Sequence, residues 1–137
     1  MSDSIFQLSK KDIMGGKVYD PAWYRVRVDD LAIAPSKNLE KPSTNFTYSG
    51  TIMFDADSGD TKFAEHPLTW LFNSGAMGFT KGFLIALGVP EETITPETRF
   101  DFKSAIGKQI DIYVENDTYQ GRLVNRVNHK YRAPRTE

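Results

Sequence analysis

Apolar and polar side chains alternate along two consecutive stretches of the chain, from Trp23 towards Ile33 and from Asn45 to Phe54. Alternation over this length predicts two strands that are each buried on one face. The intervening segment 35–44 holds two prolines, two lysines and few apolar residues, so it is predicted to be an exposed loop. The predicted inward positions are Tyr24, Val26, Val28, Phe46, Tyr48 and Phe54, and the predicted outward positions include Arg25, Arg27, Asp29, Thr47, Ser49, Thr51 and Met53.

A third extended segment and a helix are predicted to follow. A polar turn at 57–60 leads into residues 61–72, where Pro67 removes one backbone donor and indicates an edge, a bulge or a break. Apolar side chains then recur at helical spacing up to Leu87, with Ser74 as a candidate N-cap. Gly88 and Pro90 form a typical stop signal.

Two further alternating runs predict a closing pair of strands. The fourth strand begins at Gly107, with a turn expected at Asn116–Asp117 and a fifth strand from about Thr118. Three strands, a helix and two strands follow the order of the five-stranded oligonucleotide/oligosaccharide-binding (OB) barrel. We therefore expect one mainly β domain, an OB-fold barrel over 22–131 with a helix between strands 3 and 4. A lightly ordered arm at 1–21 and a polar tail at 132–137 are expected to flank it.

Composition narrows the class of function. The chain has no cysteine, which excludes disulfides, thiolate metal sites and cysteine nucleophiles. No apolar run approaches the ~20 residues of a membrane span, and the N-terminus lacks the apolar stretch of a signal peptide, so an intracellular protein is expected. The net charge is −1, but residues 119–137 carry five Lys or Arg against one Glu, a local charge of +4. This basic strip permits an anionic partner, because fields act over roughly a Debye length of ~10 Å.

Several segments resemble the small OB-fold single-stranded DNA-binding proteins of bacteriophages. They are the entry strand AWYRVRVDDL, the helix GFLIALGVP, the final strands GKQIDIYVENDTYQGRLVNRV and the close NHKYRAP. The resemblance covers about residues 15–133 and implies sequence-independent protection of single-stranded DNA in viral DNA replication or recombination, in the host cytoplasm.

The resemblance also implies which partners to expect. They are single-stranded DNA and replication or recombination proteins, with no membrane partner and no cofactor. The oligomeric state stays open, with a homodimer as one option. The basic C-terminus departs from the acidic, apolar-tipped tail with which many single-stranded DNA-binding proteins recruit partners.

Binding a single strand requires cations for phosphates and ring faces for unpaired bases. In OB folds the ligand crosses the outer face of the central strands, between the first loop and the loop joining strands 4 and 5. For Phe63 and Trp70 core packing is the alternative, because Pro67 leaves the parity of their strand open, and Tyr119 fits core and stacking equally well. The candidate nucleic-acid-binding residues are Trp23, Arg25, Arg27, Lys37, Lys41, Lys62, Phe63, Trp70, Tyr113, Tyr119, Arg122, Arg126 and Lys130.

Two other functions stay open. A structural or adaptor β-barrel of a viral particle would fit the fold without any nucleic acid. A metal-dependent phosphodiesterase would need the carboxylate-rich segment 55–66, whose spacing does not match the calcium-binding loop. Neither His66 nor His129 lies beside a nucleophile motif, and no nucleotide-binding glycine pattern is present, so we expect no catalytic and no metal-ligating residue.

Overall fold

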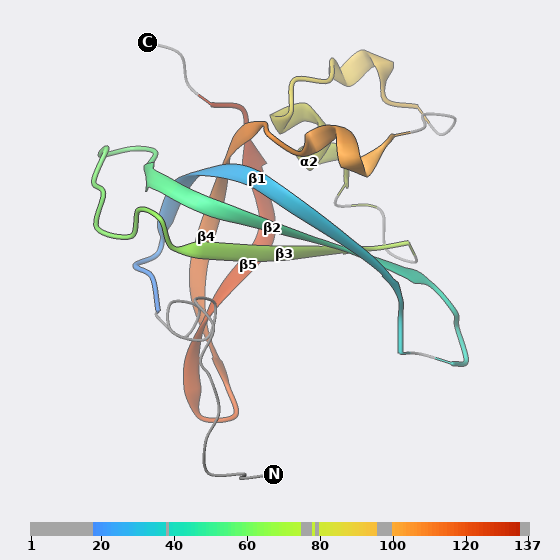
Figure 1. Ribbon diagram of the computed structural model, residues 1–137, viewed down its shortest axis with the longest axis horizontal. Coiled ribbons are helices and arrows are strands. Elements are labelled where there is room, and N and C mark those ends of the chain that lie inside the picture. Colours follow the sequence, from blue (N-terminus) through green and yellow to red (C-terminus); the bar gives the residue numbers. More distant parts are fainter. Residues whose placement is uncertain (1–17, 38, 75–77, 79, 96–99, 135–137) are drawn as a thin grey trace, which may run out of the picture.

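The computed structural model describes residues 18–37, 39–74, 78, 80–95 and 100–134. It contains five antiparallel strands in one open sheet, in the order β3-β2-β1-β4-β5 (Figure 1). The elements are β1 (Ala22–Pro35), β2 (Thr44–Asp55), β3 (Pro67–Asn73), α2 (Thr80–Ala86), the 3-10 helices η2 (Glu91–Thr93) and η3 (Phe102–Ala105), β4 (Gln109–Tyr119) and β5 (Arg122–Arg132). The prediction of a mainly β fold with five strands and a helix between the third and the fourth is confirmed.

Aromatic rings fill the core on the inner face of the sheet. Tyr48 of β2 stacks on Trp70 of β3, with ring centroids 5.5 Å apart, and contacts Phe83 of α2 at 5.1 Å. Its hydroxyl donates a 2.6 Å hydrogen bond to the carbonyl of Phe102 in η3. The Tyr48 ring is buried among apolar side chains and its hydroxyl is hydrogen-bonded. This one side chain therefore connects β2, β3, α2 and η3.

Two bulges interrupt the pairing of β1 with β2 and change the predicted parity of β2. Met53 of β2 is the unpaired residue of the first bulge, opposite the step from Arg25 to Val26, and Asp29 of β1 is that of the second, between Val28 and Asp30. Because of the first bulge Phe54 pairs with Arg25, whose guanidinium lies 5.2 Å from the ring centroid of Phe54. The prediction that Phe54 is an inward core residue is therefore wrong, because an extra residue in one strand reverses the faces beyond it.

A glycine allows β1 and β2 to approach between these bulges. A Cβ atom added to Gly50 would lie 2.6 Å from the carbonyl oxygen of Arg27 and 2.7 Å from Cγ1 of Val26. The indole of Trp70 would be 3.1 Å away. No side chain fits in this space, so Gly50 is what lets Trp70 pack under both strands.

The turn between β4 and β5 lies later than predicted. Both strands continue through Asn116 and Asp117, and the loop is Gln120–Gly121, between the paired residues Tyr119 and Arg122. Both loop residues have positive φ, 50° and 77°, which a two-residue hairpin loop that follows the strand twist requires. The predicted turn at Asn116–Asp117 is therefore wrong, and the hairpin is longer by several residues.

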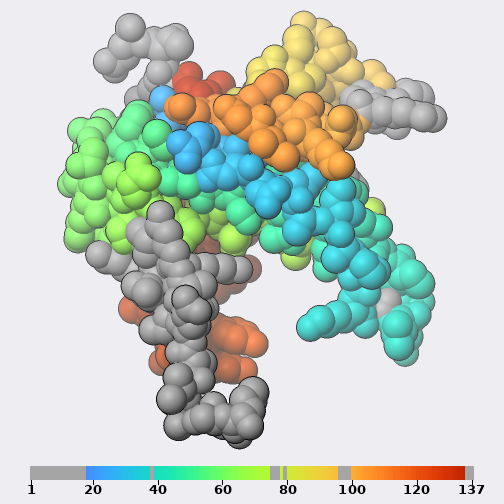
Figure 2. Space-filling view, in the orientation of Figure 1, coloured from blue at the N-terminus to red at the C-terminus, as the bar shows by residue number. Residues whose placement is uncertain are grey.

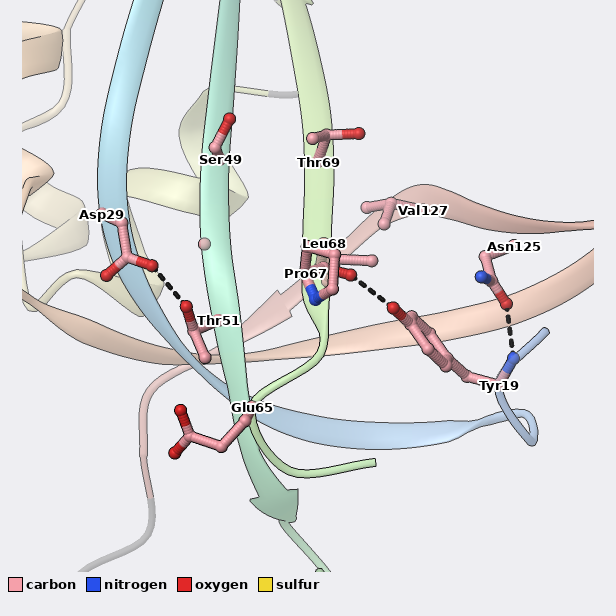
Figure 3. Close-up of a pocket in the computed structure, with 11 residues that line it drawn as sticks. Tyr19, Asp29, Ser49, Thr51, Glu65, Pro67, Leu68, Thr69, Asn125 and Val127 are labelled. Carbon is pink, nitrogen blue, oxygen red and sulfur yellow. Dashed lines mark hydrogen bonds between the residues drawn. The ribbon is translucent and has the colours of Figure 1, made fainter. Parts of the chain in front are cut away.

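Tyr19 bridges the two edge strands of the sheet. Its backbone N–H donates to Oδ1 of Asn125 in β5 at 2.7 Å, and its hydroxyl donates to the carbonyl of Pro67 in β3 at 2.5 Å (Figure 3). The side chain is only 1% exposed and its ring packs against Phe63 at 5.1 Å. The expected N-terminal arm thus ends in a core residue, which holds β3 and β5 near one another where the sheet is open; residues 1–17 lie outside the described residues.

Candidate nucleic-acid interface

The outward faces of β1, β4 and β5 bring two rings and three cations together. Trp23 pairs with Tyr113, and their ring centroids are 5.5 Å apart in an edge-to-face arrangement. The guanidinium of Arg132 lies 4.3 Å from the Trp23 ring centroid, and the ammonium of Lys130 lies 5.3 Å from that of Tyr113. We call Trp23, Arg25, Asp111, Tyr113, Lys130 and Arg132 the Trp23 cluster.

A buried carboxylate fixes the two arginines of the Trp23 cluster. Asp111 is directly opposite Arg25 on β1 and Arg132 on β5, and its side chain is 0% exposed. Nε of Arg25 donates to Oδ1 at 2.6 Å, and Nε of Arg132 donates to Oδ2 at 3.1 Å. A buried charge is tolerated only when it is paired and hydrogen-bonded, so Asp111 determines where both guanidinium groups lie.

Arg132 is the functional candidate that the sequence prediction missed, because it was assigned to the polar tail. It is the last residue of β5 and its side chain is 23% exposed. Burial acts to lower the pKa of Arg132, but its hydrogen bonds with Asp57 and Asp111 raise the pKa overall, so the guanidinium stays charged. The signal was present in the sequence, since Arg132 shares the even parity of the outward residues Arg122 and Arg126.

A bulge in β5 places Lys130 over Tyr113. Val127 pairs with Val114 and Tyr131 with Ile112, so residues 128–130 of β5 face Tyr113 alone. His129 within the bulge has a φ of 56°, a strained value for a residue other than glycine. Bulges of this kind redirect side chains. Here the bulge turns His129 towards the core residue Phe72, at 5.3 Å, and leaves Lys130 on the outward face.

His129 is expected to make the protein less stable at acid pH. Burial lowers the pKa of His129 below 6.5, so the unfolded chain takes up its proton first and unfolding is favoured as the pH falls below about 6.5. His129→Asn removes this titration and keeps a residue type that tolerates positive φ. Urea unfolding at pH 7.5 and pH 5.5 should show a smaller acid-induced loss in the variant, and an equal loss in both proteins would contradict the assignment.

The β4–β5 hairpin extends the same outward face as a projecting arm (Figure 1). Tyr119 at its end is 65% exposed and pairs with Arg122, and Arg126 pairs with Glu115. Of the two interpretations left open for Tyr119, core packing is excluded, because the turn comes one position after it and directs its ring outward with Tyr113. Arg126 forms an ion pair with Asp117. The hydrogen bond from Arg126 is the main cause that lowers the pKa of the Asp117 carboxyl.

The remaining predicted cations lie outside the Trp23 cluster. Arg27 follows Arg25 on the outward face of β1, and its Nε donates to Asp29 at 2.7 Å. Lys37 and Lys41 are exposed in the β1–β2 loop, at the end of the projecting hairpin that is cyan in Figure 2. Lys62, in the β2–β3 loop, pairs with Asp20 at 3.2 Å. The structure therefore does not bring all predicted cations into one site.

Phe63 and Trp70 are corrections to the predicted interface. Both are buried, and their rings pack against Tyr19, Tyr24, Tyr48 and Phe83. Trp70 lies on the inner face of β3 because it pairs with the buried Tyr48 of β2, which settles the parity that the sequence left open. A base cannot reach either ring, so the alternative interpretation of both residues as core is the correct one.

The carboxylate-rich segment 55–66 serves the chain itself. Oδ1 of Asp55 accepts hydrogen bonds from the N–H groups of Asp57 and Ser58, at 2.9 and 3.0 Å. Oδ1 of Asp60 accepts from the N–H of Lys62 at 2.8 Å. These are turn contacts. Within the described ranges no group of three or more His, Asp or Glu side chains lies close enough to hold a metal ion.

A groove of about 460 Å³ lies beside Tyr19, along β2 and β3 and the base of the β4–β5 hairpin (Figure 3). Its described lining includes Asp29 and Glu65 but no lysine or arginine. Partial burial acts to raise the pKa of Asp29, but hydrogen bonds from Arg27 and Thr51 hold it below its ordinary value. The described lining therefore offers no cationic side chain to a polyanion, unlike the Trp23 cluster.

Within the described part of the chain no helix has the length and apolar character to cross a bilayer. No known family model matches the sequence, and no curated protein matches it. The candidate interface therefore depends on the chain's own geometry: two rings and three cations gathered on one outward face.

Proposed function

We propose that the chain binds single-stranded DNA without sequence preference along the outward face of β1, β4 and β5. The observation that supports this most is the edge-to-face pair of Trp23 and Tyr113, with Arg132 and Lys130 lying over their rings. Single-stranded DNA needs ring faces on which its bases stack and cations that bind its phosphates. Rings and cations occur together on this face. The corresponding role is to coat and protect single strands during viral DNA replication or recombination.

The proposed path follows the outward residues of β4. From Asp111 to Tyr119 the strand advances eight residues, about 27 Å at ~3.4 Å per residue. Rings lie near both ends of this path, at Tyr113 and Tyr119, and arginines of β1 and β5 flank it. A path of this length suits the lower end of the ~4–16 nucleotides that one OB domain holds.

We also propose that the fold is an OB barrel with an open seam. In this fold strand 1 lies between strands 2 and 4 and a helix precedes strand 4. Here β1 pairs with both β2 and β4, and α2 lies between β3 and β4. The contacts of Tyr19 with Pro67 and Asn125 span the position where a closed barrel would pair strands 3 and 5.

Oligonucleotides of equal length test the function. Single-stranded DNA, duplex DNA and RNA should be titrated at several salt concentrations by gel shift or fluorescence anisotropy. We expect binding to single-stranded DNA to be tighter than to duplex, because base faces are hidden in a duplex. Log affinity should fall with log salt by ~0.7 per phosphate neutralised.

Equal affinity for duplex and single strand would contradict the proposal. Absence of binding to all three nucleic acids would favour the second candidate, an adaptor of a viral particle. That candidate is supported by the exposed apolar side chains of Ile33 and Leu39 at the β1–β2 hairpin.

A further inference from the structure

Arg132 is held by two carboxylates of very different exposure. Its Nε donates to Oδ2 of Asp111 at 3.1 Å, and its Nη2 donates to Oδ1 of Asp57 at 2.6 Å. Asp111 is 0% exposed, whereas Asp57 is 52% exposed. One end of the guanidinium is therefore fixed in the protein interior, and the other end meets a carboxylate in contact with solvent.

The buried carboxylate fixes more than one group. Asp111 also accepts from Nε of Arg25, so it orients two guanidinium groups of the Trp23 cluster. A phosphate cannot replace the Asp111 carboxylate, because this carboxylate lies beneath both arginines and out of contact with water. Asp111 thus positions the cations rather than competing with the ligand.

The exposed carboxylate comes from elsewhere in the chain. Asp57 belongs to the β2–β3 loop, 75 residues away from Arg132 in sequence. It places an anionic oxygen at the free end of the guanidinium fork. A phosphate oxygen would bind the same donor, because carboxylates and phosphates both accept from the guanidinium fork.

The same arrangement recurs along the outward face. Arg27 pairs with Asp29 and Arg126 pairs with Asp117, and in both pairs the cation and the acid are exposed. Exposed pairs contribute little to stability. Their common effect is to place a carboxylate where an incoming phosphate would have to bind.

We propose that the two carboxylates on Arg132 have opposite effects on binding: Asp111 positions the arginine for phosphate, and Asp57 competes with phosphate for it. This inference rests on the proposed function. The chain carries its own competing anion, and a DNA strand must displace it. Removal of the Asp57 carboxylate should therefore raise the affinity for DNA, and removal of the Asp111 carboxylate should lower it.

The experiment compares three single variants by fluorescence anisotropy with a labelled poly-dT oligonucleotide. Asp57→Asn keeps the shape of the side chain and removes its charge; we expect binding about 2- to 5-fold tighter at low salt and a steeper salt slope. Asp111→Asn is expected to weaken binding about 10-fold. Glu91→Gln is the matched control, since it breaks the exposed pair with Lys81 and changes net charge equally at a remote place.

A variant that lacks Arg132 separates the loss of the Asp57–Arg132 contact from the general effect of one negative charge fewer. In Arg132→Gln the competing contact is gone, so adding Asp57→Asn should no longer tighten binding. If Asp111→Asn fails to fold, which circular dichroism would reveal, this comparison still tests whether Asp57 competes for Arg132.

The outcomes are distinguishable. If the unaltered protein does not bind the oligonucleotide, the proposed function is wrong and the inference falls with it. If it binds but Asp57→Asn behaves like Glu91→Gln, or tightens binding equally in the Arg132→Gln background, the inference is wrong and the function stands. Tighter binding that requires Arg132 supports both.

Discussion

Replacement of Tyr19 by alanine is expected to lower the free energy of unfolding by about 3–5 kcal/mol. The ring is 1% exposed and packs against Phe63, so its removal leaves a cavity in the core. The substitution also removes the hydroxyl that bonds to Pro67. Both losses occur where the edge strands β3 and β5 are not paired with each other, so no ladder of hydrogen bonds between them compensates.

Urea unfolding measures the change in the free energy of unfolding. Two further variants separate the contribution of the Tyr19 ring from that of its hydroxyl and provide a control. Tyr19→Phe keeps the ring and loses one hydrogen bond, for which we expect about 1 kcal/mol. Tyr119→Ala is the matched control: it removes the same side chain from an exposed position and should change stability by less than about 0.5 kcal/mol. Similar stabilities for Tyr19→Ala and Tyr119→Ala would show that Tyr19 does not hold the two edges.

Replacement of Trp23 or Tyr113 by alanine is expected to weaken binding of poly-dT strongly. Stacking on a ring contributes about 1–3 kcal/mol per base, which corresponds to about a 5- to 150-fold increase in Kd. The two rings touch, so the double variant should lose less than the sum of the single losses. Phe100→Ala is the control, because Phe100 is a half-buried ring that packs against Phe102 instead.

The two tryptophans provide an independent readout. Trp23 lies in the Trp23 cluster and Trp70 in the core. Quenching of fluorescence by poly-dT should therefore persist in Trp70→Phe and vanish in Trp23→Phe. Quenching carried by Trp70, or an unchanged Kd in both alanine variants, would exclude the Trp23 cluster as the binding site.

Sequence pattern predicted the strands best where no bulge interrupts the alternation. The first half of β1 has the predicted parity, with Tyr24, Val26 and Val28 buried, because side chains alternate between the two faces every two residues. Phe54 was misplaced because a bulge depends on the partner strand, which a local pattern does not contain. The β4–β5 turn was misplaced because Asn-Asp is a common turn pair, and Gln120–Gly121 formed the turn instead.

The sequence predicted only part of the candidate site. Trp23, Arg25 and Tyr113 are candidate binding residues that the sequence predicts, and the structure brings them together. Arg132 was missed because a local pattern does not show where β5 ends, and the role of Asp111 depends on two strands that meet it from either side. The burial of Phe63 and Trp70 depends on how β3 and the loop before it pack on the rest of the sheet, which only the tertiary structure determines.

The alternation of acids and bases along the outward face has a kinetic consequence. Each pair of opposite charges, such as Arg126 with Asp117, cancels most of its field beyond a few ångströms. A polyanion at a distance is then not steered towards the surface, and encounters should proceed at the ~10⁵–10⁶ M⁻¹s⁻¹ of unsteered association. Selectivity would arise only after contact, in how long the ligand stays.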